Sequence, residues 1–288
     1  MRSLPRDLPP DCLEVRSAAG AWITRRECAP AIQRGEADFI LSGPGARHFA
    51  AGSGRGPLAR FTLAGLPAVG KRALHGGLLG PLLGGMYLGR RRAVDQLRAA
   101  ARLAGAGVPT PEILAVGSRP VAGLFCAQAI VAREIAGARN LHRLAGERLS
   151  DPRRRDILEK TAGLLRRMHD AGFLHADLNL ANLVLGDGPA GETVWVVDLE
   201  RGRFAGEVTA GGRIRVLARL LRSCEKWVAV PFRPTPREEV RFLRYYARGE
   251  RVLLRELVMR LSRFRSRLLV RRLSWRLLSF ARSTRPLE

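Results

Sequence analysis

The segment HADLNLANLVL, residues 175–185, places polar side chains within an otherwise apolar run. Its last residues, NLVL, are typical of a buried strand. His175, Asp177 and Asn182 are not, because a buried polar group costs free energy unless it has a partner. A second apolar run, VWVVDL at 194–199, carries Asp198 near its end. Polar groups at the ends of neighbouring strands can converge, so these two runs predict a functional site.

The residue types indicate phosphoryl transfer. Asn182 and Asp198 offer oxygen ligands to a hard cation such as Mg²⁺, and Asp177 remains free to accept a proton from a hydroxyl group. Transfer of a phosphoryl group from Mg-ATP to an alcohol requires mainly positioning and neutralisation of charge. The alternative is that Asp177 and Asn182 only stabilise turns, which is their commonest role.

The composition is strongly basic. The chain of 288 residues has 50 Lys and Arg against 26 Asp and Glu, a formal net charge of +24, and its only lysines are Lys71, Lys160 and Lys226. A GC-rich genome would explain arginine in place of lysine, but it does not explain the excess of cations. Such a charge favours anionic partners. We do not expect nucleic acid as the partner, because aromatic residues make up 6% of the chain and form no cluster with arginine.

No membrane-spanning or secretory segment is expected. The start, MRSLPRDLPPD, lacks the apolar region of a signal peptide. The most apolar segment, residues 73–89, is too short for a bilayer and is interrupted by glycine and proline. We therefore expect a cytoplasmic protein.

The chain divides into three parts by pattern. Residues 1–30 have little periodicity and are interpreted as an N-terminal extension, and residues 31–136 as a small β-rich lobe with one main helix at 90–104. Its strands include DFIL at 38–41. Residues 137–288 form a larger helical lobe, with a hinge near 134–141 and an Arg-rich tail from about 237.

The tail is amphipathic. Leucine or phenylalanine recurs at helical spacing at 254, 257, 261, 264 and 268, with arginine between them. Such a helix can lie on an anionic membrane surface. Alternatively, the apolar stripe packs on the helical lobe and the arginines face water.

Several runs carry a family resemblance. HADLNLAN resembles the catalytic loop of the protein-kinase-like superfamily, and DLE at 198–200 stands where those enzymes have DFG, without the glycine. HADLN, VWVVDLERGR, EIAGAR and RVLARLLRSCEK are similar to bacterial lipopolysaccharide-core kinases, specifically the 3-deoxy-D-manno-octulosonic acid (Kdo) kinase family. KRALHGGLLG and GAGVPTP fit the same family. The resemblance implies an α+β, two-lobed protein-kinase-like fold.

The resemblance also implies the nucleotide contacts. Lys71 would hold the α- and β-phosphates of ATP, Gly54 and Gly56 of GSGRG would cover them, and the main chain at Glu134 and Ile135 would meet the adenine. Lys71 could instead be an exposed lysine at a strand end, and GSGRG an ordinary surface turn.

Other implied roles complete the site. The helix carboxylate that pairs with the lysine in this superfamily is absent, since Gln96 takes its place with Asp95 beside it; either Asp95 substitutes or no such ion pair forms. His175 would brace the metal-binding loop. Arg201 and Arg203 would hold acidic groups of the substrate, or form a solvated basic turn.

The resemblance predicts an ATP- and Mg²⁺-dependent kinase that phosphorylates a hydroxyl of a Kdo sugar on a lipid A precursor, peripheral to the inner membrane. An anionic glycolipid as acceptor and an anionic membrane surface would explain the basic charge. The alternatives are a kinase for another sugar or for an aminoglycoside-type acceptor, and a catalytically silent member that binds membranes.

Overall fold

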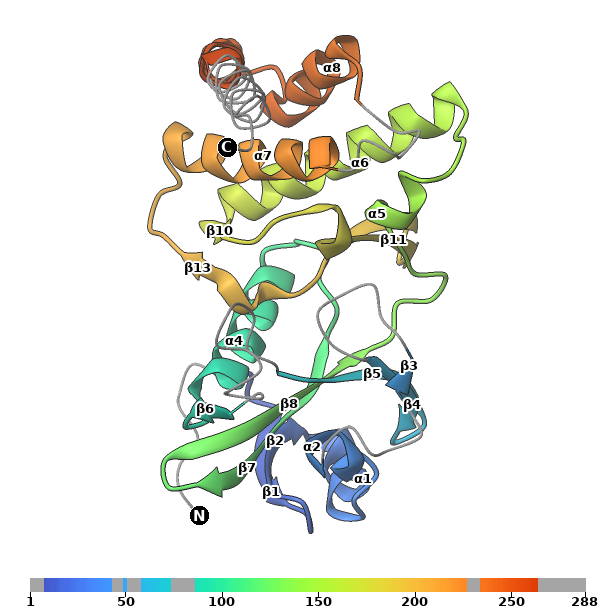
Figure 1. The fold of residues 1–288 in the computed structure, drawn as a ribbon, viewed down its shortest axis with the longest axis vertical. Helices are drawn as coiled ribbons and strands as arrows, with labels where there is room; N and C mark the ends of the chain where they lie inside the picture. Colours follow the sequence, from blue (N-terminus) through green and yellow to red (C-terminus); the bar gives the residue numbers. More distant parts are fainter. Residues whose placement is uncertain (1–7, 43–48, 51–57, 74–85, 227–233, 264–288) are drawn as a thin grey trace, which may run out of the picture.

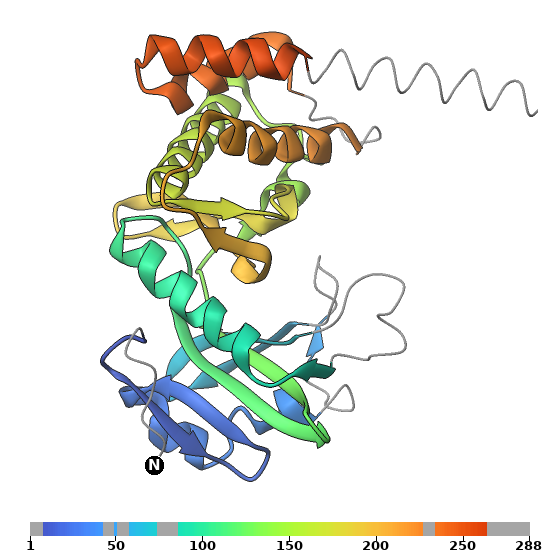
Figure 2. The ribbon, with the colours of Figure 1, turned by 90° about the vertical axis from the view of Figure 1, so that its left-hand side faces the viewer.

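The computed structural model describes residues 8–42, 49–50, 58–73, 86–226 and 234–263, which form two lobes (Figure 1). The N-terminal lobe is built on one antiparallel sheet that ends at Arg133, and the C-terminal lobe begins with a short strand at Arg139. Figure 2 shows the same division from the side, with most helices on the far side of the molecule from the sheet. The predicted α+β, two-lobed architecture is confirmed.

The N-terminal lobe contains eight strands in one sheet. Their spatial order is β1-β2-β7-β8-β5-β4-β3, and β6 pairs with β8. The strands are β1 (Cys12–Arg16), β2 (Ala21–Arg25), β3 (Phe49–Ala50), β4 (Leu58–Leu63), β5 (Leu66–Arg72), β6 (Met86–Leu88), β7 (Ile113–Ala122) and β8 (Phe125–Arg133). The helices are η1 (Arg26–Cys28), α1 (Ala29–Gln33), α2 (Asp38–Ser42) and α4 (Arg91–Gly105). Lys71 therefore lies in an inner strand, between β4 and β8.

The two faces of this sheet are buried in different cores. Side chains alternate along a strand, so Ile23 joins a cluster with α4 while its neighbour Trp22 joins a cluster with α1 and α2. Helix α2 approaches β5 at Gly70, where a Cβ atom would lie 2.3 Å from Cδ1 of Ile40. The residue before Lys71 must therefore be very small for α2 to pack as it does.

Two predictions for the N-terminal lobe need correction. Residues 12–25 are not an extension, because β1 and β2 pair with each other and β2 pairs with β7. DFIL at 38–41 is the start of helix α2 and not a strand. The burial of Trp22 and Ile23 in residues 12–25 was not predicted. DFIL was assigned wrongly because a short apolar run does not distinguish a strand from a helix.

The C-terminal lobe places its small strands beside the N-terminal lobe and its long helices beyond them (Figures 1 and 2). Its elements are β9 (Arg139–Asn140), α5 (Leu141–Leu144), α6 (Asp151–Asp170), β10 (Phe173–His175), η2 (Leu180–Asn182), β11 (Leu183–Gly188), β12 (Gly191–Val196), η3 (Leu199–Arg201), β13 (Gly202–Phe204), α7 (Ala210–Lys226) and α8 (Pro236–Ala247), and residues 251–263 are also helical.

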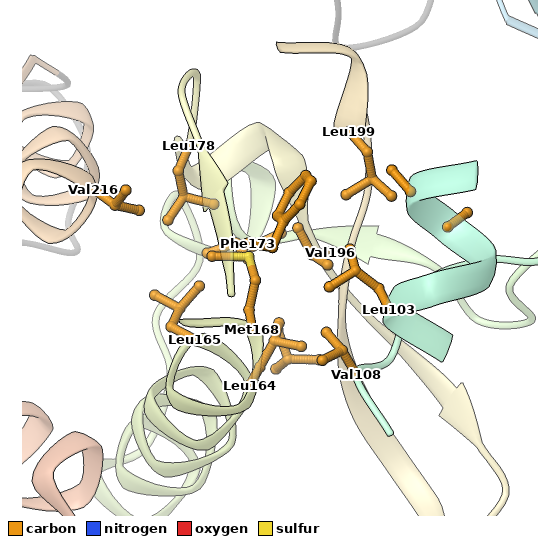
Figure 3. Close-up of a cluster of buried hydrophobic side chains, with 14 of the residues drawn as sticks. Leu103, Val108, Leu164, Leu165, Met168, Phe173, Leu178, Val196, Leu199 and Val216 are labelled. Atoms are coloured by element: carbon orange, nitrogen blue, oxygen red, sulfur yellow. The ribbon is translucent and has the colours of Figure 1, made fainter. Parts of the chain in front are cut away.

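One apolar core joins the two lobes behind the predicted site. Figure 3 shows Leu103 of α4 close to Leu199, with Phe173 and Leu178 on the other side of the same cluster. Strand β13 lies against Phe173 because Gly202 has no side chain: a Cβ atom there would be 1.9 Å from the Phe173 ring. The polar residues of the site are thus held by neighbours that are fully buried.

The described part of the Arg-rich tail packs on the C-terminal lobe. Leu257 is fully buried, and Leu254 and Leu261 pack against the lobe's core, while Arg255 and Arg263 are exposed. This arrangement agrees with the second interpretation of the apolar stripe. Phe264 and Leu268 lie outside the described residues. No helix among the residues described is long and apolar enough to cross a bilayer.

Candidate active site

The loop between β10 and η2 holds the backbone of Asp177 from both sides. The N–H group of Asp177 donates to Nδ1 of His175 at 3.3 Å. Its carbonyl oxygen accepts from Nδ2 of Asn179 and from Nδ2 of Asn182, each at 2.9 Å. The backbone of Asp177 is therefore fixed by three side chains, while its own carboxylate is partly exposed. Asn179 was not predicted as a site residue.

His175 connects this loop to the segment that carries Asp198. The side chain is fully buried, and its Nε2 lies 3.3 Å from the carbonyl oxygen of Val197. Since Nδ1 accepts from Asp177, Nε2 must carry the proton and donate to Val197. Burial lowers the pKa of His175, although the nearby carboxylates of Asp177 and Asp198 oppose that effect. A neutral histidine thus lies close to both carboxylates.

Strand pairing brings Asn182 next to Asp198. Leu183 of β11 is opposite Val196 of β12, and the N–H of Val197 donates to the carbonyl oxygen of Asn182 at 3.0 Å. Asn182 and Asp198 therefore flank the same end of one hairpin. The predicted convergence of the two apolar runs has a simple origin, because both polar residues lie just outside a two-stranded ladder.

Asp198 has an unusual backbone and a cationic partner. Its φ angle of 60° lies in the left-handed region, which few non-glycine residues adopt and which often marks a functional site. Its Oδ1 accepts a hydrogen bond from Nζ of Lys71 at 2.6 Å. Desolvation disfavours the charged carboxylate, but the charge and hydrogen bond of Lys71 outweigh it and lower the pKa of Asp198. This contact joins the N-terminal sheet to the hairpin of the other lobe.

Asp95 does not pair with Lys71, which corrects one of the two alternatives. Its carboxylate is half exposed and forms ion pairs within α4, with Arg98 at 2.8 Å and Arg91 at 3.6 Å. Gln96 is buried, and its Oε1 has no hydrogen-bond partner among the described residues. Adjacent helical residues point about 100° apart, so the side chain of Asp95 faces solvent when Gln96 faces inward.

An ion pair that the sequence analysis did not predict links α4 to the site. Arg92 of α4 pairs with Glu200, two residues after Asp198, and both side chains are mostly buried. The Arg92 guanidinium also lies 4.6 Å from the ring centroid of Tyr87. No motif indicated this pair. Glu200 stands at the position where the superfamily has the glycine of DFG.

The remaining predicted residues are placed as follows. The N–H of Glu134 donates to the carbonyl of Pro67 at 2.9 Å, and its side chain pairs with Arg60. Ile135 lies in the linker, where its carbonyl accepts from Ala138. Arg201 and Arg203 are both exposed, in η3 and β13. Gly54 and Gly56 lie outside the described residues.

The donors at the site fit a hard cation shared with a ligand. Asn182 uses its Nδ2 in the loop, which leaves Oδ1 as a potential ligand, and Asp198 uses one carboxylate oxygen for Lys71. Within the described residues, no three His, Cys, Asp or Glu side chains gather as a metal site. One carboxylate and one amide suit Mg²⁺, which commonly completes its coordination with water and phosphate oxygens.

A separate apolar cavity of about 130 Å³ lies among α5, α6, α7 and α8. Leucine, isoleucine and phenylalanine side chains dominate its lining. Two carboxylates belong to its lining, Glu238 and Glu239, and Glu238 is engaged by Arg154 and by the N-cap of α8. None of the predicted site residues lines this cavity.

The two lobes, with a lysine from the sheet meeting an aspartate from the hairpin, define a kinase-like class of fold. Comparison with solved structures agrees: the structure titled "WaaP in complex with acyl carrier protein" matches with a TM-score of 0.51 and 23% identity, over 78% of this chain and 91% of that one. A model of the lipopolysaccharide kinase (Kdo/WaaP) family matches residues 70–246. The chain belongs to the lipopolysaccharide kinase (Kdo/WaaP) family.

The sequence is also similar to curated proteins that are named as kinases of the same sugar acid. A 3-deoxy-D-manno-octulosonic acid kinase of Photobacterium damsela subsp. piscicida is 35% identical over 156 residues, 52% of this chain and 60% of that protein. One from Vibrio parahaemolyticus serotype O3:K6 is 29% identical over 179 residues, 60% of this chain and 71% of that protein. The chain thus matches between about three fifths and seven tenths of the length of these two relatives.

Proposed function

We propose that the protein is a kinase that transfers the γ-phosphoryl group of Mg-ATP to a hydroxyl of a Kdo sugar on lipid A or a related inner-core glycolipid. The observation that carries the proposal is the contact of Lys71 with Asp198 across the lobes, beside a loop that presents Asp177 and Asn182. Membership of the family and the names of the relatives support the choice of sugar.

Each residue has a distinct role in this proposal. Asp177 orients the acceptor hydroxyl and accepts its proton, because its backbone is held rigidly while its carboxylate is accessible. Lys71 binds the nucleotide phosphates. Asn182 and Asp198 would hold Mg²⁺, which when bound neutralises charge on the phosphates. His175 fixes the distance between the loop and Asp198.

The proposed place of action is the cytoplasmic face of the inner membrane, with the protein bound peripherally. The acceptor is a lipid, and the net charge of +24 favours an anionic surface. Binding to vesicles that contain phosphatidylglycerol should exceed binding to phosphatidylcholine vesicles and should weaken as salt rises. Equal binding to both lipids at all salt concentrations would contradict this placement.

The direct test is incubation with Mg-ATP and Kdo–lipid A, followed by mass spectrometry of the glycolipid. We expect one added phosphate on the Kdo portion, dependent on both ATP and Mg²⁺. Lipid A without Kdo, a heptose acceptor and an aminoglycoside serve as competing acceptors. Phosphate on one of these and not on Kdo would mean that this other acceptor is the substrate. Transfer to none of the acceptors would mean that the protein binds its ligands without catalysing the reaction.

A further inference from the structure

Helix α7 is anchored directly on the catalytic loop. Its residues Val216, Leu217 and Leu220 are buried in the core of the C-terminal lobe, and Figure 3 shows Val216 across from Leu178. The Oγ atom of Ser223 accepts the N–H of Leu180 at 3.2 Å and donates to the carbonyl of Leu220 at 2.7 Å. The position of α7 relative to the loop is therefore set by both apolar packing and hydrogen bonds.

This packing brings an arginine to the carboxylate of Asp177. Nη1 of Arg219 lies 3.9 Å from Oδ1 of Asp177, and the Arg219 side chain is 48% exposed. At this distance the two groups attract each other by charge without a direct hydrogen bond. The guanidinium thus keeps hydrogen-bonding capacity for another anion. Arg219 is part of RVLARLLRSCEK, a run to which the proposed mechanism gives no role.

Arg219 approaches the site from a different side than Lys71. Lys71 belongs to β5 of the N-terminal sheet, whereas α7 lies on the side of β10 that faces away from that sheet (Figure 1). The lysine pairs with Asp198 and the arginine lies by Asp177. If the nucleotide phosphates lie at Lys71, the cation at Asp177 is placed for the acceptor.

The chemistry of the acceptor fits this cation. The proposed sugar is an acid, so its carboxylate and its hydroxyl groups belong to one small molecule. A guanidinium binds a carboxylate through two parallel hydrogen bonds, which fix orientation as well as position. We propose that Arg219 binds the carboxylate of the acceptor sugar and so directs the reacting hydroxyl to Asp177. This inference rests on the proposed kinase function.

The test compares two variants with two acceptors. Arg219→Gln removes the cation, and Arg215→Gln is the matched control, because Arg215 is exposed one turn earlier on α7 and has no acidic partner among the described residues. The acceptors are Kdo–lipid A and its Kdo methyl ester. For the unaltered protein, esterification should lower kcat/KM by about 10- to 100-fold, the usual range for a hydrogen bond to a charged group.

In Arg219→Gln, kcat/KM for the acid should fall by about the same factor, and the ester should react as well as the acid. KM for ATP should stay unchanged. Arg215→Gln should behave as the unaltered protein. Arg219→Lys should lose less activity than Arg219→Gln, because lysine keeps the positive charge but cannot donate two parallel hydrogen bonds. Thermal unfolding of each variant checks that the fold is intact.

Two results would overturn the inference while leaving the kinase function in place. Arg219→Gln could retain the preference for acid over ester, or its defect could be confined to KM for ATP, which would place the arginine at the nucleotide. Failure of the unaltered protein to phosphorylate Kdo–lipid A at all would instead refute the proposed function, and the inference with it.

Discussion

At the scale of single residues, the side chains of one loop have two separate roles: three of them hold the backbone of Asp177, and Asp177 presents its carboxylate. Asp177 is fixed through its backbone, by His175 on one side and by Asn179 and Asn182 on the other. The carboxylate of Asp177 takes part in none of these three hydrogen bonds. A side chain that is positioned by its own backbone can be replaced with little change to its surroundings, which makes its role testable.

Asp177→Asn should reduce turnover by at least about 10²-fold, because an amide cannot accept the hydroxyl proton. The dissociation constant for Mg-ATP should change little, since Lys71 and Asp198 remain. ADP formation with Kdo–lipid A and nucleotide binding, measured on the same preparation, separate the two effects. Turnover close to that of the unaltered protein would remove Asp177 from the mechanism.

Asn179→Ala provides a graded comparison at the same loop. It removes one of the two side-chain donors to the carbonyl of Asp177 and the acceptor for the N–H of Ala181. We expect a smaller loss of turnover than for Asp177→Asn. Loss of these two hydrogen bonds should lower the free energy of unfolding by about 1–3 kcal/mol.

At the scale of secondary-structure elements, α4 is tied to the site differently from the arrangement that the resemblance implies. The superfamily pairs the lysine with a carboxylate on this helix, but here Gln96 occupies that position and Lys71 pairs with Asp198. Helix α4 is instead connected to the site through Arg92, which pairs with Glu200. The helix thus contributes the cation of this ion pair, whereas in the superfamily it contributes the carboxylate. Leu103 of α4 and Leu199 belong to one apolar core that also joins the helix to this segment (Figure 3).

A charge exchange should reveal this link. Arg92→Glu and Glu200→Arg each place like charges together in a mostly buried setting, and both should weaken Mg-ATP binding and stability. The double variant should recover most of the loss, with a coupling energy of about 1–3 kcal/mol. The readouts are chemical unfolding and nucleotide titration. Arg91→Glu is the control, because Arg91 lies on the same helix and is 90% exposed.

Simple additivity of the two single variants would contradict the coupling. The same conclusion would follow if Arg91→Glu, at the solvent-facing side of α4, weakened nucleotide binding as much as Arg92→Glu.

The helices of the C-terminal lobe contain a buried network that should respond to pH. Nδ1 of His169 in α6 lies 2.6 Å from the hydroxyl of Tyr246 in α8, and that hydroxyl accepts from Arg213 of α7 at 3.1 Å. Burial lowers the pKa of His169 to about 3. In the unfolded chain a histidine binds a proton near pH 6.5. Between these values the unfolded state binds more protons, so stability falls as pH falls.

His169→Gln should remove this dependence. The variant should be less stable at pH 7 because it disturbs the contact with Tyr246. Its deficit relative to the unaltered protein should shrink by about 2 kcal/mol at pH 5, the linkage expected for one proton. Urea unfolding at both pH values gives the double difference, in which other titrating groups cancel. A constant deficit would mean that His169 binds its proton with the same pKa in the folded and the unfolded protein.

At the scale of the whole molecule, the N-terminal residues complete the N-terminal lobe. Trp22 is fully buried in a cluster with Ile32, Ile40 and Leu41, and its Nε1 donates to Oγ of Ser17 at 3.0 Å. Helix α2 from the same cluster packs on β5 beside Lys71. The strands that were interpreted as an extension therefore support the position of the lysine.

Trp22→Ala should lower the free energy of unfolding by about 3–5 kcal/mol, the usual cost of truncating a large buried side chain. Arg16→Ala in the neighbouring strand is the control, because Arg16 is exposed. Denaturant unfolding and Mg-ATP binding should both report the loss in Trp22→Ala. A loss below about 1 kcal/mol would agree with an extension that is not part of the core.

The sequence alone determined the parts of this protein that depend on neighbours along the chain. The helix at 90–104 appears as α4, and the apolar runs around Asp177 and Asp198 form the β10 to β12 region, because periodicity and turn residues act locally. The charge and the family resemblance indicated the class of partner and of chemistry.

The tertiary structure alone decided the contacts between distant segments. Asp95 and Gln96 are adjacent in sequence, yet only packing shows that one faces solvent and the other the core. Lys71 and Asp198 are 127 positions apart, and Arg92 and Glu200 belong to different lobes. Residues 12–25 lack a clear pattern because their burial is completed by β7 and α2. Such pairings depend on which surfaces meet, and no local pattern encodes that choice.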